Sequence, residues 1–246
     1  MTADGWTQGV RHQLALGRLL PLGGPRDGAW IAEGAAVAVL AAAAADLPGV
    51  RLGALRITSA EPDDVHEPVV APPPGALPPG SLRVTADFAA GAAEPLPETA
   101  ARLRLALAAA AAERLGLAVT EVDLRVTGLL ETDAPEPADG RPGAARAVWR
   151  PPAAREARDP DEARAVAAAL AVPGVARLTG SLGGLGRAVR VERSTVGTSL
   201  PRRQVRVELA TGAGHRAVDV ARLVRIAVRD AFDDHPAVTV LVTAVE

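Results

Sequence analysis

The sequence predicts an α+β protein built from two tandem α-β-β-α-β repeats, each a small sheet packed against helices. Two alanine- and valine-rich helical runs each end at a Pro-Gly step that an apolar strand follows. Both copies continue with strands of alternating polarity, a second helix and a closing strand. Helices and strands are thus interleaved, with connections that permit antiparallel pairing, which is typical of α+β domains.

The first helix of each copy has recognisable limits. In the first copy a helical run begins at Glu33 and stops at Pro48-Gly49, and in the second a run begins at Glu162 and stops at Pro173-Gly174. Proline cannot continue a helix, and glycine adopts the positive φ that a helix end often needs. The second copy also begins with Asp159-Pro160, an N-cap acceptor followed by proline at the first helical position.

The later elements of each copy follow from periodicity. Half-buried strands are predicted where apolar and polar residues alternate, at Leu82, Val84, Ala86 and Phe88 and again at Val205, Val207 and Leu209. The second helix of the first copy ends at Gly116 and that of the second at His235-Pro236. The latter has the spacing of one buried face at Val220, Leu223, Val224, Ala227, Val228 and Ala231. The closing strands contain Val122, Leu124 and Val126, and Val238, Val240 and Val242.

The domain organisation follows from these elements. The chain begins with an N-terminal segment (1–29), which the first repeat follows (30–130). A proline-rich linker (131–158) then leads to the second repeat (159–246). A proline-rich insert at 58–80 interrupts the first repeat and is predicted to be a long exposed loop, partly polyproline II. Within the N-terminal segment, Leu19–Leu22 is a short apolar stretch that a turn follows.

Composition excludes several functional classes. The chain of 246 residues has no cysteine and no lysine, which rules out disulfide scaffolds, thiol chemistry, Schiff bases and the lysine of a P-loop. A net charge of −2 argues against a nucleic-acid partner. The longest apolar run, Ala35–Ala45, is shorter than the ~20 residues of a membrane-spanning helix. With no signal peptide recognised, we expect a cytoplasmic protein without a membrane span of its own.

Short motifs at the helix–strand junctions are shared with a known family. The first copy opens with Trp30-Ile31-Ala32-Glu33, an alanine-rich helix and Pro48-Gly49-Val50, and the second has Pro173-Gly174-Val175 and a glycine-rich loop at Gly180–Gly186. These motifs resemble the bacterial alkaline-shock, or envelope stress response, family. The first copy lacks the glycine-rich loop and the second lacks the Ile-Ala-Glu entry, and most relatives carry one copy. The resemblance implies a non-enzymatic, self-associating cytoplasmic protein that works near the envelope, often through small membrane partners.

The glycine-rich loop is the nearest feature to a phosphate-binding site. Gly183, Gly184 and Gly186, with Arg187 as their counter-charge, form a candidate ligand-binding site, because backbone N–H groups of such loops can converge on an anion. Phosphate-binding loops lead into a helix, whereas the alternation after this loop predicts a strand. An anion site and a simple connection between strands are both compatible with the pattern.

An arginine stripe on the last helix is the second candidate. Arg222, Arg225 and Arg229 lie opposite the predicted apolar face and are interleaved with acidic residues. Mixed charge of this kind is usual on a solvated helix face. The alternative is an interaction face for an acidic partner or for phospholipid head groups.

Histidines and carboxylates are grouped at other places, but in patterns with ordinary explanations. We expect the group Asp230, Asp233, Asp234 and His235 to be a solvated helix end. We expect His215 and Asp219 to be a structural pair, and His66 with its acidic neighbours to lie in a solvated loop. We therefore predict no metal site, no cofactor and no catalytic residue.

These observations favour a non-enzymatic interaction or scaffold protein. Its partner would be a second copy of the chain or a small membrane protein. The alternative is a regulatory protein that binds an anionic small molecule through the glycine-rich loop or a cleft between the repeats. An enzyme is disfavoured because the sequence brings no nucleophile, histidine and acid together.

Overall fold

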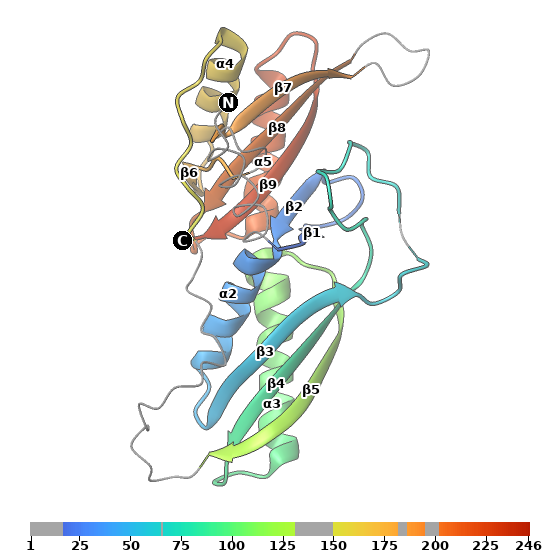
Figure 1. Cartoon of the computed structure of the whole chain (residues 1–246), viewed down its shortest axis with the longest axis vertical. Helices are drawn as coiled ribbons and strands as arrows, with labels where there is room; N and C mark the ends of the chain where they lie inside the picture. The colour runs from blue at the N-terminus through green and yellow to red at the C-terminus, as the bar shows by residue number, and fades with distance from the viewer. Residues whose placement is uncertain (1–16, 65, 131–149, 182–185, 195–201) are drawn as a thin grey trace, which may run out of the picture.

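The chain has an α+β fold, as the sequence predicts, with two mixed sheets in an elongated arrangement (Figure 1). The computed structural model describes residues 17–64, 66–130, 150–181, 186–194 and 202–246. Within this part of the chain there are four α-helices, one sheet of six strands and one of three.

The larger sheet combines strands from both ends of the described chain. Its strands are β1 (Leu19–Pro21), β2 (Ala29–Ala32), β6 (Val175–Leu178), β7 (Val189–Ser194), β8 (Arg202–Thr211) and β9 (Ala237–Val245). The strand order is β1-β2-β9-β8-β6, and β7 also pairs with β8. β9 is parallel to both β2 and β8, whereas β6 and β7 are antiparallel to β8. The segment Leu19–Leu22, expected to be a short apolar stretch before a turn, contains β1 and leads into the β1–β2 turn.

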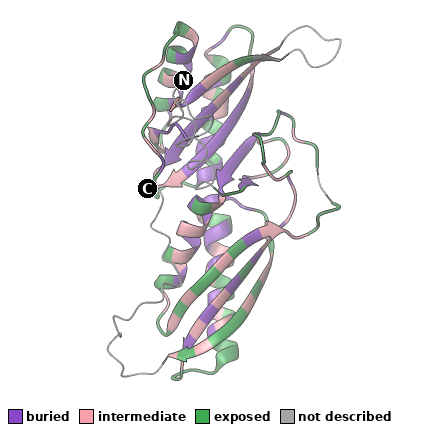
Figure 2. Ribbon diagram, in the orientation of Figure 1, coloured by how far each residue is buried: buried purple, intermediate pink, exposed green. Residues whose placement is uncertain are grey.

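The smaller sheet has the order β3-β4-β5. Its strands are β3 (Val50–Ser59), β4 (Leu82–Gly91) and β5 (Val119–Leu130). β3 is antiparallel to β4, and β5 is parallel to β4. The predicted alternation in β4 is confirmed, because its apolar side chains are buried at every second position (Figure 2). The opposite face of this sheet carries charged residues that pair across the strands, as Arg83 does with Glu121 and Asp87 with Arg125.

Helices cover one face of each sheet. α2 (Glu33–Ala45) and α3 (Leu96–Ala109), which continues as the π-helical segment η1 (Ala110–Leu115), pack on the smaller sheet. α4 (Pro160–Leu170) and α5 (Ala217–Asp230) pack on the larger one. The predicted start of α4 is confirmed, since the Asp159 carboxylate accepts the Glu162 N–H at 2.8 Å and the Glu162 carboxylate accepts the Arg158 N–H at 3.0 Å.

One residue of the predicted buried face of α5 is wrongly assigned. Leu223 is half exposed, whereas the buried positions of the helix include Val220, Val224 and Val228. The helix rests on β9 through a narrow stripe, and Leu223 lies just beyond the edge of that stripe. A 3.6-residue period cannot distinguish the edge of a buried face from its centre.

The proline-rich insert is more closely packed than the sequence suggests. β3 continues to Ser59, and the insert then crosses the β1–β2 hairpin. Leu77 donates its N–H to the Leu19 carbonyl at 2.8 Å and accepts the indole N–H of Trp30 at 3.1 Å. Val70, Pro73 and Pro79 are buried. Prolines give up backbone donors but keep their carbonyls, so this segment can cover the sheet edge without forming a strand.

The end of the segment predicted as a linker also joins the larger sheet. The Pro152 carbonyl accepts the Gly180 N–H at 3.2 Å, and Arg155 donates its N–H to the Gly186 carbonyl at 2.7 Å. Residues 152–155 therefore run beside the end of β6. Residues 131–149 of the predicted linker lie outside the described residues.

The contacts between the two sheets include a shared connection and a close approach of two helices. β2 belongs to the larger sheet and leads directly into α2, which packs on the smaller sheet. Near the C-terminal end of η1, Gly116 accepts the Gly23 N–H at 3.2 Å and lies against Val218 of α5. Gly116 has φ 87°, the left-handed conformation that ends a helix without a Cβ penalty.

We expect Gly116→Ala to lower the free energy of unfolding by about 2–4 kcal/mol. Alanine is unfavourable at this positive φ, and its methyl group would overlap the Val218 side chain. Gly75→Ala is the matched control: Gly75 has φ 74° and open space around it, so only the backbone cost of about 1–2 kcal/mol applies. Chemical denaturation measures both, and equal losses would contradict the close approach of Gly116 to α5.

Candidate functional site

The arginine stripe on α5 is engaged in contacts with the β1–β2 turn. Arg222 forms two hydrogen bonds to the Asp27 carboxylate, at 2.8 and 2.9 Å, and contacts Asp219 at 3.0 Å. The hydrogen bond from Arg222 is the main cause that lowers the pKa of Asp27, against the opposing effect of its partial burial. The same contact raises the pKa of Arg222. This bidentate pair fastens the turn to the helix.

The other two arginines of the stripe also have partners. Arg225 donates to the backbone carbonyl of Arg26, and Arg229 contacts Asp230 at 2.9 Å. Burial lowers the pKa of Arg225, and repulsion from Arg229 lowers it further. Arg222 and Arg225 thus both bind the β1–β2 turn, whereas Arg229 lies near the end of the helix and binds Asp230. The stripe fixes the β1–β2 hairpin more than it offers free positive charge.

Two exposed apolar side chains lie beside this arginine stripe on α5. Leu223 and Ile226 are 50% and 48% exposed. The helix α4, which packs against α5, also has a half-exposed apolar residue, Leu170. This exposed apolar face was missed in the sequence, because Leu223 fitted the buried stripe and Ile226 was not distinguished from the solvated arginine face.

The glycine-rich loop separates two strands that pair with the same neighbour. β6 precedes it, β7 follows it, and both are antiparallel to β8, so the predicted strand after the loop is confirmed. Gly183 and Gly184 lie outside the described residues. Gly186 has φ 68° and packs against the Arg155 side chain. No helix N-terminus follows the described end of the loop to provide convergent N–H groups.

Arg187, the proposed counter-charge of the loop, is committed to a buried carboxylate. Its guanidinium lies 2.6 Å from Glu162, whose side chain is only 6% exposed and also receives the Arg158 N–H. The ion pair therefore connects the end of the loop to the first turn of α4. An anionic ligand at this loop would therefore compete with Glu162 for the Arg187 guanidinium.

A buried glutamate next to the same loop was not recognised in the sequence. Glu208 alternates with apolar residues of β8 and so resembled an exposed position, but it is 97% buried and accepts the Ser181 N–H at 2.7 Å. Thr179 and Thr243 form a further buried hydrogen bond at 2.8 Å. The segment around the loop thus covers this face of the sheet, which the pattern of one strand cannot reveal.

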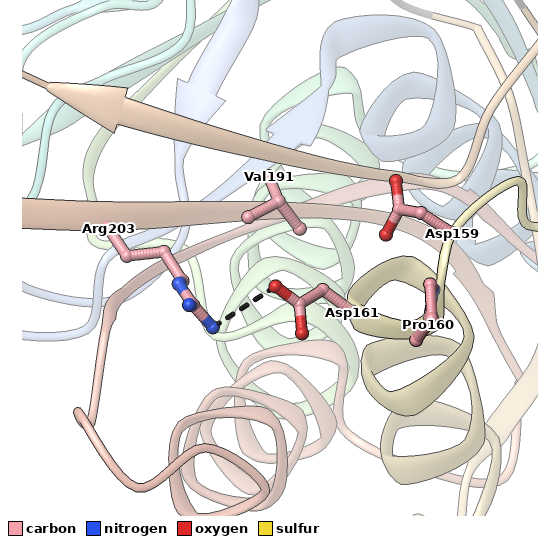
Figure 3. A pocket seen from close by; sticks show the side chains of 5 residues that line it. All are labelled: Asp159, Pro160, Asp161, Val191 and Arg203. Atoms are coloured by element: carbon pink, nitrogen blue, oxygen red, sulfur yellow. Dashed lines mark ion pairs between the residues drawn. The ribbon is translucent and has the colours of Figure 1, made fainter.

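An open depression of about 570 Å³ lies between the start of α4 and the β7–β8 pair (Figure 3). Its lining residues are Asp159, Pro160, Asp161, Val191 and Arg203. The Arg203 guanidinium extends toward Asp161, at 3.3 Å, and also contacts Asp234 at 3.3 Å. It lies 5.2 Å from the centre of the Phe232 ring. Arg203 thus stands between the carboxylates of Asp161 and Asp234 in an ion cluster that joins α4 to the β7–β8 pair.

The histidine and carboxylate groups are not brought into a metal or catalytic arrangement. Asp219 contacts Arg216 and Arg222, and no contact joins it to the exposed His215 within the described part of the chain. Asp230 lies 3.8 Å from His235, whereas Asp234 contacts Arg203 instead. Among the described residues, no group of three or more histidines and carboxylates could hold a metal ion.

Two comparisons with known proteins found no relative. No protein-family model matches the chain, and a search of curated proteins found no match. In the described part of the chain, every helix is too short or too polar to cross a lipid bilayer.

The Arg222–Asp27 pair has a predictable pH dependence. The lowered pKa of Asp27 means that the pair stabilises the fold above the ordinary carboxyl value of 3.8 and loses this effect as the pH falls through the lowered value. We expect Asp27→Asn to cost about 1–2 kcal/mol at pH 7 and much less near pH 2. Asp87→Asn removes an exposed bidentate pair as control and should cost less. A cost of Asp27→Asn that is independent of pH would contradict the assignment.

For Arg187, a structural role and an anion-binding role predict different results. We expect Arg187→Gln to cost about 2 kcal/mol, because the buried Glu162 carboxylate loses its partner. The Arg187→Gln/Glu162→Gln double variant should lose less than the sum of the single losses. The midpoint Tm of the protein should not rise in millimolar inorganic phosphate. Additive losses, together with a phosphate-dependent Tm that Arg187→Gln abolishes, would favour the anion site.

Proposed function

We propose that the chain is a non-enzymatic cytoplasmic interaction protein, a two-copy scaffold of the alkaline-shock or envelope stress response type. The observation that carries this proposal is the exposed apolar face of α5, in which Leu223 and Ile226 lie beside arginines that are held by their own contacts. Exposed apolar side chains that adjoin one another on a helix mark interaction sites more often than catalytic ones.

The pairing pattern of the two sheets supports the duplication. In the smaller sheet, β4 is antiparallel to β3 and parallel to β5, and α3 connects β4 to β5. In the larger sheet, β8 is antiparallel to β6 and β7 and parallel to β9, and α5 connects β8 to β9. The same order of elements and directions is what two diverged α-β-β-α-β copies would produce. In this comparison, the glycine-rich loop interrupts the strand that corresponds to β3.

The chemistry of the α5 face indicates its partner. Leu223 and Ile226 favour an apolar partner surface, whereas Arg222 and Arg229 already have Asp27 and Asp230 as partners. A short amphipathic helix with an apolar stripe fits this description, and the cytoplasmic segment of a small membrane protein can supply one. Covering these apolar side chains would stabilise the complex by about 25 cal/mol for each Å² of apolar surface removed from water.

Site-specific photo-crosslinking tests this proposal. A benzophenone side chain at Ile226 should yield one adduct of defined mass in host cells, recovered with the membrane fraction, whereas the same probe at the exposed Ala42 of α2 should not. A probe at Arg229 should also yield this adduct, and Leu223→Glu/Ile226→Glu should abolish the adduct from the Arg229 probe. The double substitution should change the free energy of unfolding by less than about 0.5 kcal/mol. No adduct at Ile226, or an equal yield at Ala42, would contradict the proposal.

A further inference from the structure

The outer edge of the smaller sheet is unpaired in the described part of the chain. β5 is the last strand in the order β3-β4-β5 and is 12 residues long. An edge strand of this length presents a row of backbone N–H and C=O groups that can pair with another strand. The Arg104 side chain of α3 donates to the Val122 carbonyl at 3.2 Å, an exposed contact that can open when a partner strand approaches.

Apolar side chains at this edge are incompletely covered. Val126 lies opposite the buried Phe88 and Leu129 opposite the buried Ala90, so both belong to the helix-covered side of the sheet. They are nevertheless 41% and 64% exposed. A strand added beside β5 would place side chains directly next to them.

The other side of β5 carries a short charge pattern. Glu121, Asp123 and Arg125 lie opposite Arg83, Thr85 and Asp87 of β4, on the solvent-facing side of the sheet. The side chains of Asp123 and Arg125 are 62% and 74% exposed, even though Arg125 contacts Asp87 and Asp123 lies 3.6 Å from Arg83. Both therefore remain accessible to a further charge of opposite sign.

β5 is self-complementary when it meets a second copy of itself in the antiparallel direction with Leu124 on the two-fold axis. In that register, Asp123 of each copy faces Arg125 of the other. On the opposite side, Val122 faces Val126 and Val119 faces Leu129. Every apolar residue at the edge thus meets an apolar residue, and each of the two symmetric charge pairs is attractive.

Neighbouring registers lack this match. With Asp123 on the axis, Glu121 of each copy would face Arg125 of the other, but the two Asp123 side chains would face each other, and Val119 and Val126 would each face a threonine. With Arg125 on the axis, two arginines would face each other. A shift by one residue would place the charged side against the apolar side. The apolar and charged residues of this edge together therefore favour the register about Leu124.

We propose that β5 pairs with β5 of a second copy about Leu124, which joins two three-stranded sheets into one of six strands. The inference rests on the self-association included in the proposed function and names its surface. The resulting dimer is closed, because the same edge is used by both copies. It leaves α5 free, so the edge and the α5 face can act independently.

Charge reversal and restoration test this pairing. Sedimentation equilibrium of the wild-type chain should show reversible conversion from 25.1 kDa to twice that mass as concentration rises. Asp123→Arg should weaken dimerisation about tenfold or more, because both symmetric pairs become repulsive. Asp123→Arg/Arg125→Asp should restore dimerisation, although it disturbs the contacts of both residues within their own chain. Restoration therefore separates a contact between copies from a loss of folding.

Cysteine cross-linking provides an independent readout, since the natural chain has no cysteine. Leu124→Cys should form a disulfide-linked dimer on mild oxidation, because residues on the axis lie about 5.5 Å apart between Cα atoms. Thr85→Cys, on the central strand β4, is the matched control and should not.

Four results would overturn the pairing: a chain that stays monomeric, dimerisation that charge reversal leaves unchanged, failure of the double variant to restore it, or no cross-link at Leu124→Cys. The Ile226 adduct should persist in Asp123→Arg, so failure of the β5 pairing and failure of the α5 interaction are distinguishable.

Discussion

The parallel pairing of β2 with β9 is the interaction on which the rest of the structure depends. Trp30 and Ile31 of β2 lie beside Leu241 and Val242 of β9, and all four are almost completely buried. Because β2 leads directly into α2, this pairing connects the larger sheet to the helix that covers the smaller one. The proline-rich insert then closes over the same strands through the Trp30 indole. Loss of the pairing would expose the core of both halves.

The distribution of charge around this core is consistent with the proposed interaction role. The arginines that could have bound an anion are used inside the fold: Arg222 and Arg225 hold the β1–β2 turn, Arg187 holds Glu162, and Arg203 stands between two carboxylates. Two exposed features of the described residues are of another kind, an apolar face on α5 and the edge of β5 that no described strand pairs with. Both suit a macromolecular partner, because they offer surface and backbone groups rather than an enclosed reactive site.

Local signals in the sequence predict the elements but not how they are combined. The N-cap of α4, the glycine after η1 and the alternation of β4 depend on neighbouring residues and are correctly placed. The parallel partner of β2 and the packing of the proline-rich insert depend on contacts between residues far apart in the chain. The partners of Arg222 and Arg187 could not be recognised for the same reason, since they lie 195 and 25 residues away in the chain. Glu208 resembled a solvent-facing strand position until the covering segment was known.

The most direct measurement of the central claim is equilibrium unfolding followed at Trp30 alone. In Trp6→Phe/Trp149→Phe, Trp30 is the remaining tryptophan and reports on the β2–β9 pairing. If this pairing joins both sheets into one cooperative unit, the fluorescence transition and the far-ultraviolet circular dichroism transition have the same midpoint and slope. A change in Trp30 fluorescence that precedes the loss of most secondary structure would show that β2 separates from β9 while both sheets persist, and would contradict the account.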